Sequence, residues 1–269
     1  MASSLPLGIF DSGVGGLTVV NAIREALPRE SIIYFGDTAR VPYGNKSPDT
    51  VARFAEEISR FLLTKNVKAI VIACNTASAH ALPFLQKKIP VPVFGVIRPG
   101  VEAALKATRE GKIGIIGTAG TIKSMAYQNM LKEAREGVKL VTQAAPLLVP
   151  LIEENWIMHS AAKLIVEEYV KEFQKEQIDT LVLACTHYPL LKPLFAEILG
   201  ESVALVDSST ACASNLREHL KALDQFNESS SEAAIDIFLT DLPLHFTGML
   251  KHFLKGEANS IQVVHLPFE

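Results

Sequence analysis

The chain has 269 residues, enough for one large core or for two modest domains. Apolar residues make up 48%, which is ample for burial, and the formal net charge is −3 with lysine and arginine scattered along the chain. Because no basic stripe is present, we expect no nucleic-acid partner. No apolar run reaches membrane-spanning length, so we expect no membrane partner either.

The start of the chain and its cysteines indicate a compartment. Met1–Pro6 lacks both the basic start and the long apolar run of a signal peptide. Three cysteines in a chain of this length do not make a disulfide framework. We therefore predict a cytoplasmic location. In that compartment a functional thiol acts through its reactivity rather than by forming a structural disulfide.

Short β-rich runs alternate with helical patterns along almost the whole chain. The candidate strands, in chain order, are Leu7–Phe10, Ile32–Gly36, Ala69–Ala73, Val91–Gly95, Ile113–Gly117, Leu140–Thr142, Thr180–Ala184, Val203–Val206 and Ile235–Leu239. The clearest helix is predicted over Asp49–Lys65, behind the start signal Ser47–Pro48. This alternation predicts an α/β fold in which helices cover both faces of parallel strands.

Two segments of the chain resemble each other without a gap. Val67–Thr76 and Ile178–His187 are each an apolar strand that ends in Ala-Cys and continues into polar residues. A weaker sequence similarity relates Gly8–Gly13 to Gly114–Ala119. We therefore predict two similar parallel-sheet α/β domains related by a pseudo-two-fold, with the active site in the cleft between them. The first domain is expected to comprise residues 1–97 and 208–269, and the second, inserted domain residues 98–207.

Polar and thiol side chains gather where the predicted strands end, and there ligands bind in open α/β sheets. The residues at or just past such ends are Asp11, Asp37, Cys74, Thr118, Cys185 and Asp207. A pseudo-two-fold places Cys74 and Cys185 on opposite walls of one cleft. Both precede a predicted helix, and a helix start lowers a thiol pKa toward neutrality. We infer that one thiol removes a proton from a carbon and the other returns one on the opposite side, which yields the mirror image.

The neighbours of these cysteines supply further polar groups. Asp11 and Ser12 open the glycine-rich turn Asp11–Gly16, which can hold an anion but matches neither the P-loop nor the dinucleotide fingerprint. His187 follows Cys185 by two residues and can exchange a proton with the thiol or favour the thiolate. Neutral groups suited to carboxylate and ammonium come from Asn75, Thr76, Thr118 and Thr121.

The remaining cysteine and histidine residues show no spacing typical of a metal site or a catalytic site. Cys212 falls in the helical pattern Ala211–Leu223 and is expected to be a small buried residue. His80, His159 and His252 are too scattered to form a zinc motif, so we predict no metal site.

A series of motifs in this chain resembles a known family. In order, the motifs are Gly8–Leu17, Gly36–Asp37, Val41–Gly44, Ala73–Ala77, Gly117–Thr118 with Thr121, Val149–Glu153 and Ala184–Pro189. Together they cover about Leu7–Leu220 and are similar to the glutamate racemase family, within the cofactor-independent aspartate/glutamate racemase superfamily. The resemblance implies a homodimeric enzyme of two α/β domains that needs no pyridoxal phosphate, flavin or metal.

The resemblance also implies a substrate and residue roles. The small-molecule substrate is glutamate, interconverted between its L and D forms to supply D-glutamate for peptidoglycan. Cys74 is implied to deprotonate the D-enantiomer with help from Asp11, and Cys185 the L-enantiomer with help from His187 and Glu153. The residues implied to bind the substrate are Asp11, Ser12, Tyr43, Gly44, Asn75, Thr76, Thr118, Thr121, Thr186 and His187.

Other functions remain open from the sequence. An aspartate or hydantoin racemase shares the two-thiol logic with a different pocket, whereas related decarboxylases have a single thiol. Cys185 and His187 can also form the nucleophilic pair of an amidase, which leaves Cys74 unexplained. A binding protein on the same fold has no use for either thiol.

Overall fold

Strongly apolar runs form two parallel sheets in the structure, a computed structural model that describes residues 2–228, 233–242 and 246–266. The first sheet has the order β10 (Ser260–Val263), β9 (Ile235–Leu239), β2 (Ile32–Gly36), β1 (Leu7–Asp11), β3 (Ala69–Ile72) and β4 (Val93–Gly95). The second has the order β6 (Lys139–Ala144), β5 (Lys112–Gly117), β7 (Thr180–Ala184) and β8 (Ala204–Asp207). All the strand pairs are parallel, which confirms the predicted fold class.

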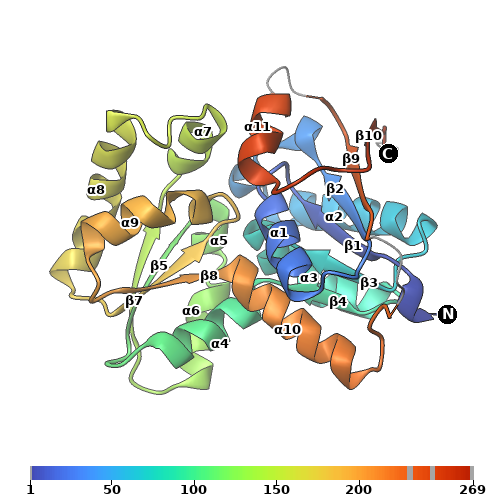
Figure 1. The fold of residues 1–269 in the computed structure, drawn as a ribbon. Helices are drawn as coiled ribbons and strands as arrows, with labels where there is room; N and C mark the ends of the chain where they lie inside the picture. Colours follow the sequence, from blue (N-terminus) through green and yellow to red (C-terminus); the bar gives the residue numbers. More distant parts are fainter. Residues whose placement is uncertain (1, 229–232, 243–245, 267–269) are drawn as a thin grey trace.

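Helices cover both faces of each sheet (Figure 1). Those beside the first sheet are α1 (Leu17–Ala26), α2 (Pro48–Thr64), α3 (Asn75–Lys88), α10 (Ser208–Ala222) and α11 (Phe246–Phe253). Those of the second are α4 (Ile97–Ala107), α5 (Ala119–Lys123), α6 (Ala126–Ala134), α7 (Leu148–Glu153), α8 (Ser160–Lys175) and α9 (Lys192–Leu199). Short 3-10 helices are η1 (Ala2–Ser4), η2 (Thr38–Arg40), η3 (Tyr43–Asn45) and η4 (Tyr188–Leu191).

Alternate residues of each strand face opposite helical layers, because strand side chains alternate between the two faces. Ile9 and Val71 join the core formed with α1 and α10, whereas Phe10 and Ile72 join the core formed with α2 and α3. Some helices begin at a side chain that caps them, namely α2, α3, α5, α8 and α10. The clearest case is α2, where Ser47 accepts a hydrogen bond from the Thr50 N–H at 3.3 Å.

The two sheets repeat one topology. The order β2-β1-β3-β4 in the first sheet corresponds to β6-β5-β7-β8 in the second. The similar segments identified in the sequence fall on equivalent strands, β3 and β7, each of which pairs with the first strand of its sheet. The carboxyl end of β3 leads to Cys74 and that of β7 leads to Cys185, so equivalent positions carry the two thiols.

The chain crosses between the sheets through α4 and returns through α10. Residues 7–95 and 235–263 supply the first sheet, and residues 112–207 supply the second. Both termini lie in the domain of the first sheet (Figure 1). The boundaries at 97/98 and 207/208 stay a prediction.

The edges of the sheets differ from the sequence prediction. Strand β10 was not predicted, because Ile261 and Val263 are 43% and 47% exposed and the segment shows no buried pattern. Strand β4 begins at Val93 rather than at Val91, and β6 extends to Ala144. Edge strands have few core contacts, so their periodicity is weak.

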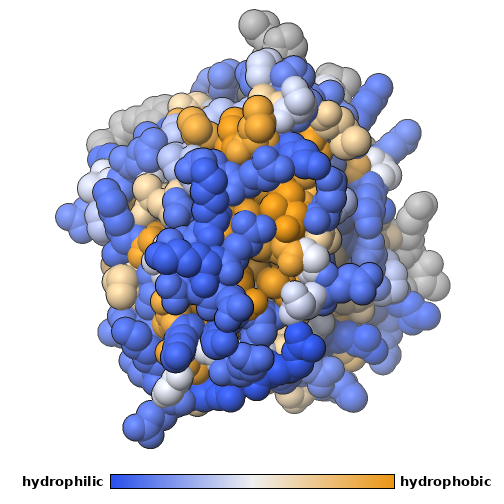
Figure 2. Space-filling view, turned by 90° about the vertical axis from the view of Figure 1, so that its left-hand side faces the viewer, coloured by the Kyte–Doolittle hydropathy of each residue, from blue (hydrophilic) through white to orange (hydrophobic). Residues whose placement is uncertain are grey.

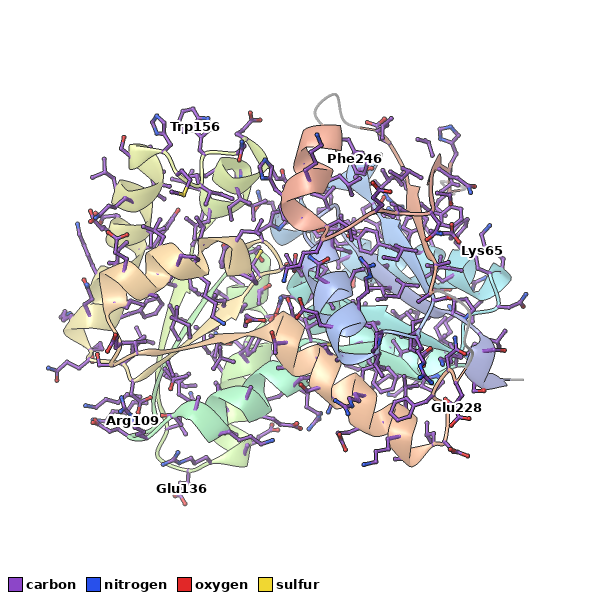
Figure 3. All side chains as sticks on the ribbon, viewed as in Figure 1. Lys65, Arg109, Glu136, Trp156, Glu228 and Phe246 are labelled. Atoms are coloured by element: carbon purple, nitrogen blue, oxygen red, sulfur yellow. The ribbon has the colours of Figure 1, made fainter. Side chains whose placement is uncertain are left out.

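The face that carries α8 and α9 is mostly hydrophilic, with a hydrophobic region near its centre (Figure 2). Arg109 and Glu136 lie at the end of the second domain opposite Trp156 (Figure 3). None of the helices in the described ranges is long and apolar enough to cross a membrane.

Candidate active site

A cavity of about 260 Å³ lies among the segments that follow the strands of the two sheets. The residues predicted for the site that line it are Ser12, Tyr43, Gly44, Cys74, Asn75, Thr76, Thr118, Glu153, Cys185, Thr186 and His187. The two thiols therefore face one space, although they lie 111 residues apart (185 − 74). Both are free thiols and both are buried, with exposed fractions of 6% and 5%.

Two predicted site residues, Asp11 and Thr121, lie behind the cavity wall rather than on it. The Asp11 carboxylate is fully buried and accepts a hydrogen bond from the Gly13 N–H at 3.0 Å and another from the Thr186 hydroxyl at 3.4 Å. The hydroxyl of Thr121 lies 3.1 Å from that of Thr76 and 3.0 Å from that of Thr118. Both residues thus hold groups that line the cavity.

Two acids at strand ends, Asp37 and Asp207, do not line the cavity. Asp37 accepts hydrogen bonds from Arg40 at 2.6 Å and from the Tyr43 hydroxyl, and so anchors the segment that carries Tyr43. Asp207 caps helix α10 and pairs with Lys192 at 3.1 Å. The expectation that ligands bind where strands end predicts the correct edge of the sheet. Whether an acid at that edge lines the cavity depends on the hydrogen bonds of its own side chain.

Cys74 lies at the N-terminus of α3. Its sulfur accepts a hydrogen bond from the Ala77 N–H at 3.4 Å and lies 3.7 Å from the Ser12 hydroxyl oxygen. Burial raises the pKa of Cys74 to about 12, and the Asp11 carboxylate adds to the rise. The expectation of a partly ionised thiol near neutrality is therefore wrong for Cys74 in the unliganded cavity, because desolvation outweighs the helix start.

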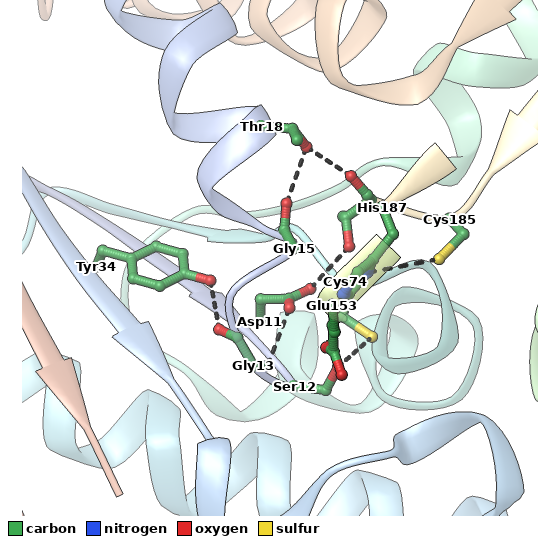
Figure 4. Close-up of polar contacts among 11 residues, drawn as sticks. Asp11, Ser12, Gly13, Gly15, Thr18, Tyr34, Cys74, Glu153, Cys185 and His187 are labelled. Atoms are coloured by element: carbon green, nitrogen blue, oxygen red, sulfur yellow. Dashed lines mark hydrogen bonds and ion pairs between the residues drawn. The ribbon is translucent and has the colours of Figure 1, made fainter. Parts of the chain in front are cut away.

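Cys185 has a different neighbour. Its sulfur lies 3.9 Å from Nδ1 of His187, and Nε2 of that ring lies 2.9 Å from a carboxylate oxygen of Glu153 (Figure 4). Burial alone lowers the pKa of His187, but its hydrogen bonds with Cys185 and Glu153 raise the pKa to about 10. The ring is therefore an imidazolium at neutral pH. The 3-10 helix η4 follows Cys185, so the expected α-helix start is present at Cys74 only.

The glycine-rich turn lets the two domains approach each other. A Cβ atom at Gly15 would lie 2.4 Å from ring atoms of His187 and 2.5 Å from the Thr186 hydroxyl oxygen. No side chain fits in that space, so only glycine allows the first domain to contact Thr186 and His187 of the second so closely. The turn also presents the Gly13 N–H to Asp11.

Several residues that line the cavity were given no site role from the sequence, although four of them lie in the motifs Val41–Gly44 and Val149–Glu153. They are Val41, Pro42, Asn45, Ala119, Pro146, Val149 and Pro150. Most are apolar and carry no chemical signal of their own. Two missed supports are the Tyr34 hydroxyl, which donates to the Gly13 carbonyl at 2.7 Å, and the Thr18 hydroxyl, which lies 2.9 Å from the Thr186 carbonyl (Figure 4).

Neither lysine nor arginine occurs among the described side chains that line the cavity. Its positive potential comes instead from the His187 imidazolium and from the N-terminus of the 14-residue helix α3. In the described part of the chain, no group of three or more His, Cys, Asp or Glu side chains could hold a metal ion.

The fold and the cavity define an α/β enzyme whose site lies between two similar domains. The model of the Asp/Glu/hydantoin racemase family matches residues 15–216, which is 202 of 269 residues (216 − 15 + 1). The chain belongs to this family and is an isomerase.

Individual relatives agree over the full length. A glutamate racemase of Geobacter metallireducens is 47% identical over 98% of this chain and 97% of its own. The crystal structure of a glutamate racemase isoform from Bacillus anthracis is 38% identical, with a TM-score of 0.94 over 99% of this chain and 100% of that one. The crystal structure of glutamate racemase from Francisella tularensis in complex with D-glutamate is 37% identical, with a TM-score of 0.92 over 98% of each chain. The resemblance expected from the motifs is thus confirmed.

Proposed function

We propose that this chain interconverts L- and D-glutamate by proton transfer at the α-carbon, with one thiol on each side of that carbon and no cofactor. The observation that carries the proposal is one cavity to which the first domain contributes Cys74 and the second contributes Cys185. The names of the similar proteins supply glutamate as the substrate, and one of them is a complex with D-glutamate.

The size and lining of the cavity suit an amino acid with two carboxylates. Its volume of about 260 Å³ is just below the range of roughly 300–1,000 Å³ that holds drug-sized ligands. The positive end of α3, at Asn75 and Thr76, favours a carboxylate. We propose that the substrate's carboxylates and amine are bound by the set Asp11, Ser12, Tyr43, Gly44, Asn75, Thr76, Thr118, Thr121, Thr186 and His187. Asp11 and Thr121 act within this set by orienting Thr186, Thr76 and Thr118.

The proton balance of the reaction needs only the two thiols. With L-glutamate, the Cys185 thiolate takes the α-proton, and the electron pair of the broken C–H bond stays on the substrate, delocalised into the carboxylate. The Cys74 thiol then donates its proton to the opposite face and becomes a thiolate. The product is D-glutamate, and the two sulfurs have exchanged protonation states. With D-glutamate the same steps run in reverse.

The neighbours of each sulfur favour opposite protonation states. The His187 imidazolium, supported by Glu153, stabilises negative charge on Cys185. The Asp11 carboxylate disfavours negative charge on Cys74 and so keeps it as a proton donor. When D-glutamate binds, its ammonium group adds a positive charge to the site, which offsets Asp11 and allows Cys74 to ionise.

The same proposal covers the biological setting. D-glutamate formed here supplies peptidoglycan synthesis in the cytoplasm, and the enzyme acts as a homodimer of chains with domains 1–97 plus 208–269 and 98–207. Support for this setting comes from the family resemblance alone.

A direct assay tests the function. Purified protein, dialysed against chelator and freed of pyridoxal phosphate, is incubated with L-glutamate, and optical rotation is followed until it reaches zero. L-aspartate in a parallel sample tests the neighbouring substrate class. We expect glutamate alone to racemise. Racemisation of aspartate alone, a need for added pyridoxal phosphate, or a stable acyl adduct on Cys185 would each overturn the proposal.

A further inference from the structure

A buried tyrosine of the second domain reaches the cavity wall of the first. Tyr127 lies on α6 and is fully buried, and its hydroxyl donates to the Asn75 side-chain oxygen at 2.7 Å. The amide nitrogen of Asn75 lies 3.3 Å from the Ser208 hydroxyl oxygen. Asn75 thus links Tyr127 and Ser208 in one polar cluster.

This cluster is placed where the chain passes between the two domains. Ser208 is the first residue of α10, directly after strand β8 of the second sheet. On the other crossing, a Cβ atom at Gly100 of α4 would lie 3.1 Å from the Tyr127 hydroxyl oxygen and 3.2 Å from its ring. The phenol of Tyr127 therefore packs closely against α4 at a position where a larger residue than glycine would crowd it.

The hydrogen bonds fix the orientation of the Asn75 amide. The phenol donates to the amide oxygen, so the amide nitrogen points away from Tyr127, with one N–H directed to Ser208 and the second N–H outside this cluster. Asn75 lines the cavity while its side chain is 98% buried (100 − 2). A donor fixed in this way matches a carboxylate oxygen.

We propose that Tyr127, with Ser208, is a positioning residue that holds the Asn75 amide as a hydrogen-bond donor for a substrate carboxylate, and so couples substrate binding to the junction between the domains. This inference rests on the proposed function. Without the phenol, the buried amide oxygen of Asn75 loses its partner and the amide is free to rotate. Binding then weakens, whereas the thiols keep their neighbours.

The test is the variant Tyr127→Phe, which keeps the ring and removes only the hydroxyl. We expect KM to rise about tenfold for both enantiomers, because one hydrogen bond to a charged group is lost, while kcat changes less than about twofold. Titration calorimetry with D-glutamate is expected to give the same rise in Kd. Tyr188→Phe is the matched control, since Tyr188 is equally buried and its hydroxyl donates to the Ala145 carbonyl at 2.8 Å. It is expected to lower Tm without raising KM.

A double-mutant cycle separates positioning from general loosening. In an Asn75→Ala background, Tyr127→Phe is expected to have no further effect on KM, because Tyr127 acts through Asn75. If Tyr127→Phe folds poorly, Ser208→Ala is tested in its place in the same cycle. Additive effects, an unchanged KM in the single variant, or equal losses in the Tyr188 control would overturn the inference. If the wild-type protein fails to racemise glutamate, the proposed function is wrong instead.

Discussion

The two thiols of the cavity occupy equivalent positions in a repeated fold, yet their surroundings differ. Cys74 follows β3, caps α3 and has the Asp11 carboxylate as a charged neighbour. Cys185 follows β7 and has the His187 ring 3.9 Å from its sulfur. The comparison teaches that the repeat determines where the sulfurs lie. The charged groups beside them, Asp11 near Cys74 and His187 near Cys185, make the two positions electrostatically different.

This difference cannot favour one direction of the overall reaction. L- and D-glutamate have equal free energies, so the equilibrium constant is one and kcat/KM must be the same in both directions. What the surroundings can change is the protonation state of the resting enzyme. The proposed starting state for L-glutamate has a thiol at Cys74 and a thiolate at Cys185, and that for D-glutamate has the reverse. For this reason kcat and KM are free to differ between the enantiomers, while their ratio is not.

Removal of either sulfur is expected to have the largest effect. Cys74→Ala and Cys185→Ala should each lower racemisation by at least about 10³-fold, because one of the two proton carriers is lost. The remaining thiol should still exchange the α-proton of one enantiomer with D₂O, which is L-glutamate in Cys74→Ala and D-glutamate in Cys185→Ala. Chiral chromatography and proton NMR measure the two rates.

Cys212→Ala is the matched control for these variants. Cys212 is also buried, at 1% exposed, and does not line the cavity. Its replacement should leave kcat/KM unchanged. Exchange of both enantiomers in both single-thiol variants would contradict the assignment of one sulfur to each face.

Replacement of the imidazolium is expected to come next in size. His187→Gln should lower kcat/KM by about 10²-fold in both directions, because negative charge on Cys185 loses its charged partner. Glutamine keeps a hydrogen-bonding group at the position, so the Tm should fall little. Steady-state kinetics with each enantiomer provide the measurement, and a loss below about threefold would show that Cys185 does not depend on the ring.

The pH dependence of kcat/KM also tests the role of His187 beside Cys185. The pKa of His187 is raised to about 10, so the imidazolium persists at neutral pH and is lost as the pH rises through about 10. We expect kcat/KM of the wild type to fall along that basic limb. Glu153→Gln removes the carboxylate that favours the imidazolium, so the limb should move to lower pH, with a loss of about tenfold or less at pH 8. A limb that stays in place would show that another group titrates there.

The smallest expected effect on kcat comes from loss of the hydrogen bond between Thr18 and Thr186. The Thr18 hydroxyl lies 2.9 Å from the Thr186 carbonyl oxygen, and Thr18→Val keeps the shape of the side chain without that donor. We expect a loss of about 1 kcal/mol in the free energy of unfolding and a decrease in kcat of about threefold or less. Thermal unfolding and kinetics check this. A fall in kcat as large as that of His187→Gln would place Thr18 in the chemistry itself.

Much of the fold could be predicted because its strands are buried on both faces. Runs such as Ala69–Ile72 and Thr180–Ala184 are apolar throughout, and their matched Ala-Cys ends reveal the repeat. Strand β10 could not be predicted, since an exposed edge strand carries no apolar period.

The candidate site could be located from the sequence where the side chain itself carries reactive chemistry, as for the two thiols and His187, which line one cavity. Their catalytic roles stay a prediction. The supports of the site could not be located in this way, because Tyr127 and Thr18 act through contacts between residues far apart in the chain. The ionisation of Cys74 was also predicted incorrectly, since a sequence shows the helix start but not the depth of burial.

The most direct test of the two-sided proton transfer follows L-glutamate in D₂O by proton NMR and chiral chromatography, with wild-type protein free of cofactors. Early in the reaction, the D-glutamate formed should carry deuterium on its α-carbon, while the L-glutamate that remains keeps its proton. D-glutamate that retains the substrate's own α-proton would contradict transfer between two sulfurs on opposite faces of the carbon.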